Sequence, residues 1–298
     1  MDFDSLTIFK TVVDEGGIIA AARKLHRVQS GVTTRIKQLE ASLGVELFLR
    51  DRRRLTLSPA GEIFLGYVEQ LLRLAEQARH AVLGDAPHGV LRLGTLESTA
   101  ASRLPPFLAH YHQQYPAVRV ELATDTTDAL VEGVVCRTFD AAFVVGRVEA
   151  MGLEVLEAFD EELVIVAPRS HPAIGCADDV RTDTIICFPI GCAYRRLLYA
   201  WLAAGAVVPD KVLALSSYHA MMACVASGTG IALVPRSVLE TMRVSDSLTV
   251  YPLPEEHARM TTHLVWRHGE ISPALRALHM EILASQASIA KPELQTHS

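Results

Sequence analysis

The chain has no long hydrophobic run, no paired cysteine motif and no basic leader, and each absence excludes a class of protein. No apolar stretch approaches the roughly 20 residues that a membrane-spanning helix needs. The first residues carry acid where a secretory signal carries base. The five cysteines show no C-x-x-C spacing, which is typical of a reduced intracellular protein rather than of a disulfide framework. We therefore expect a soluble, cytoplasmic protein with no membrane partner.

A basic overall charge is also missing. The formal net charge is −6, and half of the 298 residues are hydrophobic. The apolar content excludes a mainly disordered chain, and the acidic balance argues against a protein that coats nucleic acid over its whole surface. At about 100–200 residues per domain, the length suits two domains, or a small one and a large one.

The first part of the chain, to about residue 58, is predicted to form short helices followed by a basic hairpin. One face of the first helix is apolar at helical spacing, through Leu6, Phe9 and Val13. An alanine-rich helix at 20–25 follows after a short break, and a third helix covers about 29–42. The strand-like pieces 47–50 and 55–57 then enclose a charged tip.

Two helices with a tight turn, the second with small polar groups outward, are typical of a helix-turn-helix that enters the major groove of DNA. A generic three-helix domain with a solvated polar face is the alternative. The charge favours DNA, because nine cations and three anions between Ala20 and Leu57 leave +6. The residues that we predict to contact DNA are Gln29, Ser30, Thr33, Thr34, Arg35, Lys37, Arg52, Arg53 and Arg54.

One long helix is predicted to follow, over residues 59–86. Ser58 supplies an N-cap and Pro59 a first-turn proline. A single apolar seam is predicted on this helix, at Phe64, Val68, Leu71, Ala75, Ala78 and Val82. A helix between two domains has little core of its own, so the expected surface for this seam is the same helix of a second copy.

The rest of the chain, over 87–298, alternates strand and helix, which predicts a mostly parallel α/β sheet. One predicted strand is the buried run Ala141–Val145, and about nine others follow the same pattern. So many strands over about two hundred residues indicate two α/β lobes rather than one sheet.

The sequence resembles the LysR-type transcriptional regulators over essentially its whole length. The segments that carry the resemblance are 20–25 (AAARKL), 29–32 (QSGV), 36–40 (IKQLE), 43–50 (LGVELFLR), 55–61 (LTLSPAG) and 228–235 (GTGIALVP). The chain departs from the family at Val28, where Ser or Thr is usual, at Gly31, where Ala is common, and at Ile19. A lost cap and a helical glycine each cost about 1 kcal/mol, so DNA affinity or sequence preference is expected to differ from the family norm.

The resemblance implies a multi-domain protein that regulates transcription and is not an enzyme. It implies a winged helix-turn-helix at 1–58, a linker and dimerisation helix at 59–86, and an effector-binding domain at 87–298. The last is expected to resemble periplasmic substrate-binding proteins, with one lobe at about 87–161 and 268–298 and the other at about 162–267. The expected partners are double-stranded DNA, a small-molecule effector and further copies of the chain, as a homodimer or homotetramer. No cofactor is expected.

The effector is expected in a cleft between the lobes, next to strand ends. Hydroxyls that open helices there suit an anion, and Arg195 suits a carboxylate, so we predict an anionic metabolite. The predicted effector-binding residues are Ser98, Thr99, Thr126, Thr127, Cys192, Tyr194 and Arg195. The alternatives are that the hydroxyls only cap helices and that Arg195 is a surface cation.

Other chemistry has less support in the sequence. Cys192 is either a redox switch or, as is commoner, a small buried apolar residue. His219 is interpreted as a core histidine rather than a ligand contact, and no metal site is expected. The competing function is a solute-binding or transport component, because the third part of the chain alone resembles that fold. A catalytic function comes last, for lack of a recognisable site.

Overall fold

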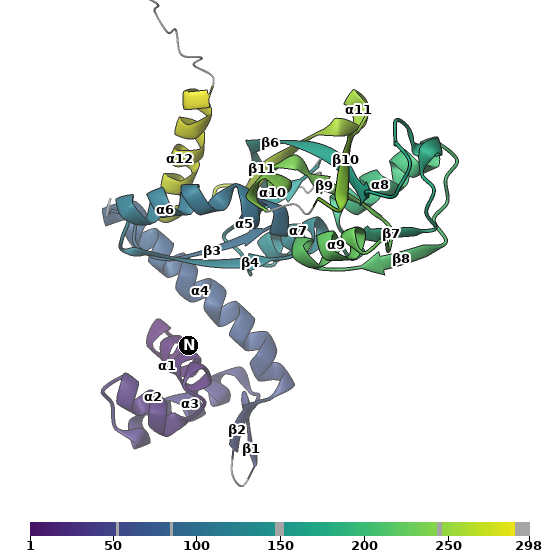
Figure 1. Ribbon diagram of the computed structural model, residues 1–298. Helices are drawn as coiled ribbons and strands as arrows, with labels where there is room; N and C mark the ends of the chain where they lie inside the picture. The colour runs from purple at the N-terminus through teal and green to yellow at the C-terminus, as the bar shows by residue number, and fades with distance from the viewer. Residues whose placement is uncertain (52–53, 84–85, 147–151, 243–245, 290–298) are drawn as a thin grey trace, which may run out of the picture. The chain divides into compact units, whose positions relative to one another are not determined.

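A computed structural model describes residues 1–51, 54–83, 86–146, 152–242 and 246–289, and it separates the chain into two units, Met1–Asp85 and Ala86–Ser298. The first unit contains short helices, a hairpin and a long helix (Figure 1). Its elements are α1 (Phe3–Asp14), α2 (Ile18–Lys24), α3 (Gln29–Leu43), β1 (Phe48–Asp51), β2 (Arg54–Leu57) and α4 (Pro59–Leu83). The helices and hairpin predicted for this part of the chain are therefore confirmed.

Apolar side chains at helical spacing form the core of the first unit. The ring of Phe9 in α1 packs against those of Phe48 and Phe64, at centroid distances of 5.3 and 5.2 Å. The buried face of α3 consists of Val32, Ile36 and Leu39. Because these three positions share one side of the helix, the opposite side of α3 remains outside the core.

Two polar contacts join the hairpin and α4 to this core. The Ser58 hydroxyl donates to the Glu46 backbone oxygen at 2.7 Å and accepts from the Gly61 N–H at 3.0 Å. Ser58 therefore caps α4, as the sequence predicts. Glu40 of α3 accepts a hydrogen bond of 2.9 Å from the Leu47 N–H through Oε1, which fixes the start of the hairpin.

The apolar residues of α4 divide between two faces, which corrects the single predicted seam. The positions that pack into the core of the first unit are Phe64, Leu65, Val68 and Leu72. The large apolar residues that remain exposed, at spacings of four, four and three, are Ile63, Tyr67, Leu71 and Leu74. We refer to these four residues as the α4 stripe. Of the other predicted seam residues, Ala75 is half-buried, Ala78 is exposed, and the Val82 side chain lies outside the part that the structure describes.

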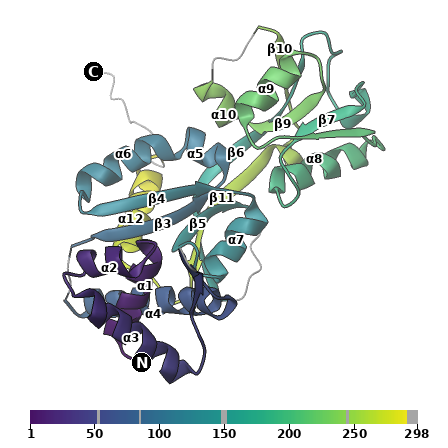
Figure 2. The same cartoon turned by 90° about the horizontal axis from the view of Figure 1, so that it is seen from below.

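The second unit is an α/β domain in which helices cover a continuous path of strands (Figure 2). The strands are β3 (Gly89–Thr95), β4 (Val118–Thr124), β5 (Ala141–Val145), β6 (Leu153–Pro168), β7 (Thr184–Cys187), β8 (Lys211–Ala214), β9 (Ile231–Pro235), β10 (Leu248–Pro252) and β11 (Arg259–Arg267). The helices are α5 (Glu97–Ser102), α6 (Leu104–Gln114), α7 (Thr127–Val135), the 3₁₀ helix η1 (Ala177–Asp179), α8 (Ala193–Ala204), α9 (Tyr218–Ala226), α10 (Arg236–Thr241), α11 (Glu255–Ala258) and α12 (Pro273–Ile289).

The strand path is mixed, so the prediction of a mostly parallel sheet is wrong. The order is β4-β3-β5-β11-β6-β9-β7-β8, with β10 paired to β6. The pairs around β3 and β7 are parallel, whereas every pair that includes β6 or β11 is antiparallel. Residues 153–162 of β6 pair with β11, and residues 163–168 pair with β9 and β10. The two lobes therefore share one strand instead of having separate sheets.

Helices cover both faces of each lobe because consecutive strand residues point to opposite faces. In the lobe of β7 and β9, α8 packs on one face, and α9 and α10 pack on the other. In the lobe of β3 and β5, α7 packs on one face, and α6 and α12 pack on the other. Residues of α7 and α8 belong to one core cluster that continues from lobe to lobe. Within the described residues, no helix has both the length and the apolar character to span a membrane.

Candidate nucleic-acid interface and effector site

The outer face of α3 presents short polar side chains beside a cation. The predicted DNA-contact residues that are exposed on this helix are Gln29, Ser30, Thr34 and Lys37, and the half-buried ones are Thr33 and Arg35. The hydroxyls of Thr33 and Thr34 donate to the backbone oxygens of Gln29 and Ser30, at 2.9 and 2.8 Å. Both hydroxyl oxygens keep acceptor capacity, so this face can bond to donors on a partner.

Arg35 lies at the edge of this face and is directed toward acidic residues at the start of the chain. Its guanidinium nitrogens lie 3.6 Å from carboxylate oxygens of Asp2 and Asp4. Arg27 donates two hydrogen bonds to Asp4, at 3.0 and 2.7 Å. The pKa of Asp2 is lowered mainly by its hydrogen bond from the Ser5 N–H, and Arg35 makes a smaller contribution. Arg35 is therefore partly engaged within the first unit.

A shallow groove of about 600 Å³ on this face includes residues that the sequence prediction omits. Its lining consists of Arg27, Val28, Ser30, Gly31, Thr34, Arg35 and Gln38. Within this lining, a row at spacings of four, three and four is formed by Arg27, Gly31, Thr34 and Gln38. The helical period would have identified Gly31 and Gln38 as members of the outer face. A selection by side-chain chemistry alone misses Gly31.

The wing beside α3 is an antiparallel hairpin. β1 and β2 pair from Phe48↔Leu57 to Asp51↔Arg54. Arg52 and Arg53 lie outside the described residues, and of Arg54 only the backbone is described. The contacts predicted for these three arginines stay predictions.

Gly31 is not required by the fold of α3. A Cβ at this position would meet only Val28 Cγ2, at an ordinary contact distance of 3.6 Å. Alanine in place of an interior helix glycine stabilises a protein by about 0.5–1 kcal/mol. We expect Gly31→Ala to raise the free energy of unfolding of the full-length protein by this amount, measured by urea denaturation.

Gly61→Ala is the matched control for this measurement. A Cβ at Gly61 would lie 2.1 Å from the Leu47 backbone oxygen, and this atom cannot move away without a shift of the backbone. The expected result is destabilisation at Gly61 and stabilisation at Gly31. A loss of stability in Gly31→Ala would mean that the fold does need this glycine.

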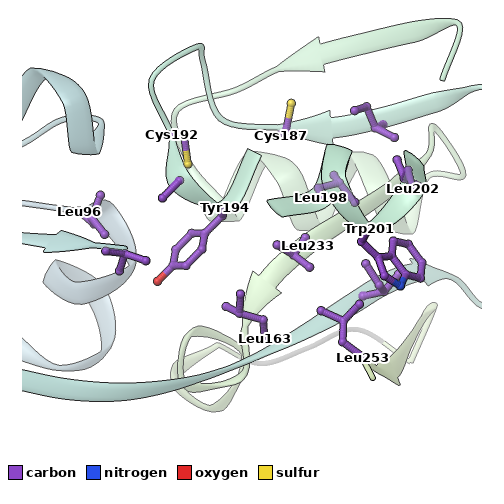
Figure 3. Packing of buried hydrophobic residues seen from close by; sticks show 14 of the residues in the cluster. Leu96, Leu163, Cys187, Cys192, Tyr194, Leu198, Trp201, Leu202, Leu233 and Leu253 are labelled. Atoms are coloured by element: carbon purple, nitrogen blue, oxygen red, sulfur yellow. The ribbon is translucent and has the colours of Figure 1, made fainter. Parts of the chain in front are cut away.

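Buried hydroxyl groups without hydrogen-bond partners lie on both lobes. Ser98 and Thr99 are buried in α5, directly after β3. Tyr194 belongs to α8 of the other lobe, and Figure 3 shows its ring pointing toward Leu96, the residue before α5. Among the described residues, no hydrogen bond of normal geometry reaches the hydroxyls of Ser98, Thr99, Tyr194 or Thr127, the last at the start of α7. The Ser98 hydroxyl nevertheless acts on the Tyr194 phenol, where it opposes the effect of burial on the pKa. Because buried polar groups are normally hydrogen-bonded, these four hydroxyls are candidates for bonding to a polar ligand.

Ionisable groups around these hydroxyls are shifted toward their neutral forms. Burial raises the pKa of Tyr194, and the nearby Glu161 carboxylate adds to the increase. Burial also raises the pKa of Tyr218. The pKa of Glu97 is raised by burial, while the Tyr218 backbone N–H and His219 act in the opposite direction. At neutral pH the two tyrosines are therefore phenol donors. The sequence prediction omits Tyr218 as a site residue, although it follows a strand end.

The other predicted effector residues lie next to this region. Thr126 contacts the turn at Gly191, where φ is +96° and a Cβ would lie 2.9 Å from Thr126 Oγ1. The Arg195 guanidinium donates to the Phe188 backbone oxygen at 3.3 Å and lies over the ring of Tyr199 at 5.6 Å. Among the described residues, no contact joins Arg195 to the unpartnered hydroxyls. The structure therefore directs this guanidinium along its own lobe.

Two further side chains bear on the alternatives that the sequence left open. Cys192 is buried and unpaired, and burial raises the pKa of its thiol. Because the thiolate is the reactive form, this favours the apolar interpretation over a redox switch. His219 is exposed on α9, so the prediction of a core histidine is wrong. The described part of the chain contains no cluster of three or more side chains suited to a metal ion.

An ion pair between a half-buried arginine and a buried carboxylate connects both lobes to the shared strand β6. Arg103, between α5 and α6, donates to the two carboxylate oxygens of Glu161 at 2.8 and 3.0 Å. The Ser237 hydroxyl of α10 donates to Glu161 at 2.7 Å and lies 3.1 Å from the Ser102 hydroxyl of α5. Arg103 and Ser237 are 58 and 76 residues away from Glu161 in the chain, so no local sequence pattern identifies this network.

Both units match known protein-family models. Residues 3–62 match the model described as bacterial regulatory helix-turn-helix protein, lysR family. Residues 84–287 match the model described as LysR substrate binding domain. The two matches together span most of the chain.

Individual proteins show the same similarity. The chain is 37% identical over 280 residues to the HTH-type transcriptional regulator GltR of Bacillus subtilis (strain 168), which covers 93% of this chain and 94% of GltR. A full-length OxyR variant from Pseudomonas aeruginosa superimposes with a TM-score of 0.71 at 21% identity, covering 100% of this chain and 99% of that one. Full-length CbnR complexed with its target DNA gives a TM-score of 0.66 at 24% identity, with 96% and 100% covered. These structures share the fold, and the sequence match extends over both units.

Proposed function

The chain belongs to the LysR family of DNA-binding transcriptional regulators, which are not enzymes, and we propose that it binds an operator under the control of a small anionic metabolite. The observation that carries the DNA part is the exposed polar face of α3. In this proposal α3 enters the major groove and presents Gln29, Ser30, Thr33, Thr34 and Lys37 to base edges. Arg35 and the wing arginines Arg52, Arg53 and Arg54 contact phosphates.

The proposed division of the chain follows from the same family. Residues 1–58 form the DNA-binding domain, 59–86 the linker helix and 87–298 the effector-binding domain. The lobes of the last are about 87–161 with 268–298, and about 162–267. The separation into two compact units between Asp85 and Ala86 supports this division.

The four unpartnered hydroxyls support an effector site between the lobes. Ser98, Thr99 and Thr127 come from one lobe and Tyr194 from the other, so a ligand that bonds to all four would bridge both. The N–H groups at the start of α7 favour an anion. Thr126 and Cys192 adjoin this region, and Arg195 remains the proposed carboxylate partner. A ligand that prefers one arrangement of the lobes would bias the protein toward it.

The exposed α4 stripe supports a homodimer formed through the linker helix, and pairs of such dimers form the proposed homotetramer. Two DNA-binding domains related by a two-fold axis suit an operator with paired half-sites. The proposed location is the cytoplasm, where such a regulator meets DNA and metabolites.

The function is tested with the full-length protein on its own upstream DNA. A shifted band at low salt, and a footprint that changes when a candidate metabolite is added, are the expected results. A protein that binds a metabolite but never shifts this DNA would instead be a solute-binding component.

Substitutions at the unpartnered hydroxyls test the effector site. We expect Ser98→Ala and Tyr194→Phe each to reduce the thermal shift that the active metabolite produces in the wild type, because each removes a ligand hydrogen bond from one lobe. The measurement is the melting temperature with and without that metabolite. Neither hydroxyl has a hydrogen bond of normal geometry among the described residues, and each change removes only the weaker Ser98–Tyr194 interaction, so the ligand-free melting temperatures should stay close to the wild-type value.

Ser227→Ala and Tyr199→Phe are the matched controls. Ser227 is exposed at the end of α9, and Tyr199 lies in the same helix as Tyr194 but is only half-buried. Both controls should keep the full shift. A full shift in both test variants would place the metabolite elsewhere.

A further inference from the structure

An apolar side chain stands in an otherwise polar groove on the outer face of α3. Val28, the N-cap residue, is 72% exposed, and every other lining residue except Gly31 has a polar or charged side chain. The Val28 side chain forms no capping hydrogen bond and is not part of the core of the first unit. Single exposed valines are ordinary on protein surfaces, so the exposure of Val28 alone does not indicate a function. Its position among polar residues in this groove does indicate one.

Gly31 lies next to Val28 and leaves its methyl groups accessible. A Cβ at Gly31 would touch Val28 Cγ2, and no other atom outside the helix backbone lies within 4 Å of it. The glycine is therefore unnecessary for packing, yet it opens a depression beside the valine. Together the two residues form a small apolar depression with polar groups around it.

The major groove of DNA contains one apolar group that fits such a depression. Thymine carries a C5 methyl there, whereas the other edge groups in that groove are hydrogen-bond donors and acceptors. Residues at the start of a recognition helix are the ones that reach base edges. The surrounding Arg27, Ser30 and Gln38 supply the charge and hydrogen-bonding groups that a DNA partner requires.

We propose that Val28 and Gly31 recognise the C5 methyl of one thymine in each half-site of the operator. Val28 contacts the methyl group, and the missing side chain of Gly31 lets the backbone of α3 approach the base pair closely. This inference rests on the proposed function, in which α3 lies in the major groove. It assigns a specificity role to two positions that otherwise only weaken the helix.

Deoxyuridine in place of thymine tests the proposal, because it removes only the C5 methyl. Full-length protein is titrated with operator duplexes in which each thymine in turn is replaced. At one symmetric pair of positions, the wild type should bind about fourfold more weakly for each methyl lost, which is the effect of one buried methyl-sized group. Val28→Ser should bind the thymine and deoxyuridine operators equally. This variant gains a capping hydroxyl, so it retains the helix.

Gly31→Ala separates the role of the glycine from that of the valine. Its added methyl should weaken binding of the thymine operator, although the helix itself becomes more stable. The proposal is overturned if the wild type does not distinguish the two operators, if Val28→Ser distinguishes them as the wild type does, or if Gly31→Ala binds with unchanged affinity. Absence of any operator binding by the wild type is a different result, which would reject the proposed function itself.

Discussion

Arg103→Ala is expected to lower the free energy of unfolding of the second unit by about 3–5 kcal/mol, the usual cost of leaving a buried charge without its partner. The Glu161 side chain is only 1% exposed, and Arg103 supplies both of its charged hydrogen bonds. After the substitution, only the Ser237 hydroxyl still donates to this carboxylate among the described contacts. The effect is large because the Glu161 carboxylate is almost fully buried, although the Arg103 side chain that covers it is 33% exposed.

The measurement is urea denaturation followed by tryptophan fluorescence. Both tryptophans of the chain, Trp201 and Trp266, lie in the second unit, so the signal reports on that unit alone. The adjacent pair on β6 is the control. Arg236 donates to Glu162 at 2.8 Å, but these side chains are 40% and 49% exposed, so Arg236→Ala should cost no more than about 1 kcal/mol. Equal losses in the two variants would show that burial of Glu161 does not matter.

Leu71→Glu is expected to convert the proposed dimer into monomers and to weaken operator binding by roughly 10²–10⁴-fold. A charge in the middle of the α4 stripe would have to be buried without a partner when two helices pack together. The affinity falls because a monomer binds a single half-site. In a dimer, binding of the first DNA-binding domain holds the second domain close to the other half-site, and a monomer loses this contribution. Light scattering after size exclusion gives the mass, and a gel-shift titration gives the affinity.

Leu283→Glu is the control for this substitution. Leu283 lies in α12 and is 38% exposed, close to the 36% of Leu71, so the same charge is added at a similar surface position on another helix. This variant should remain dimeric and bind the operator normally. A dimeric Leu71→Glu protein would reject the α4 stripe as the interface, and α12 would become the next surface to test.

The elements that the sequence predicts well are those whose local pattern has one explanation. α3 has one apolar face and β5 is a continuous apolar run, and both form as their own residues predict. The cap of α4 is equally local, because Ser58 bonds to the N–H of Gly61, only three residues further along the chain. The first half of β6 is missed because charged residues such as Glu154 and Glu157 interrupt its pattern. That strand forms because β11 pairs with it, which no local signal reveals.

The residues of the candidate sites also fall into two groups, those that a local pattern predicts and those whose direction depends on distant elements. The sequence predicts Ser98 and Thr127 as site residues because both follow strand ends at the start of a helix, and their role stays a prediction. The direction of a long flexible side chain is not set by its position in the chain. Arg195 turns along its own lobe and Arg35 toward Asp2, because the partners that hold them come from other elements. For α4, the period alone cannot say which of two apolar faces the first unit will cover.

The strand that the lobes share also determines how this domain loses its structure. β6 is hydrogen-bonded to β11 through residues 153–162 and to β9 and β10 through residues 163–168, and one core cluster continues from lobe to lobe, so the melting of either lobe exposes core residues of the other. Its backbone amides then exchange with solvent in one cooperative opening rather than in two. A metabolite at the proposed site between the lobes would stabilise that whole unit by mass action, so binding at this one site would slow amide exchange throughout the domain.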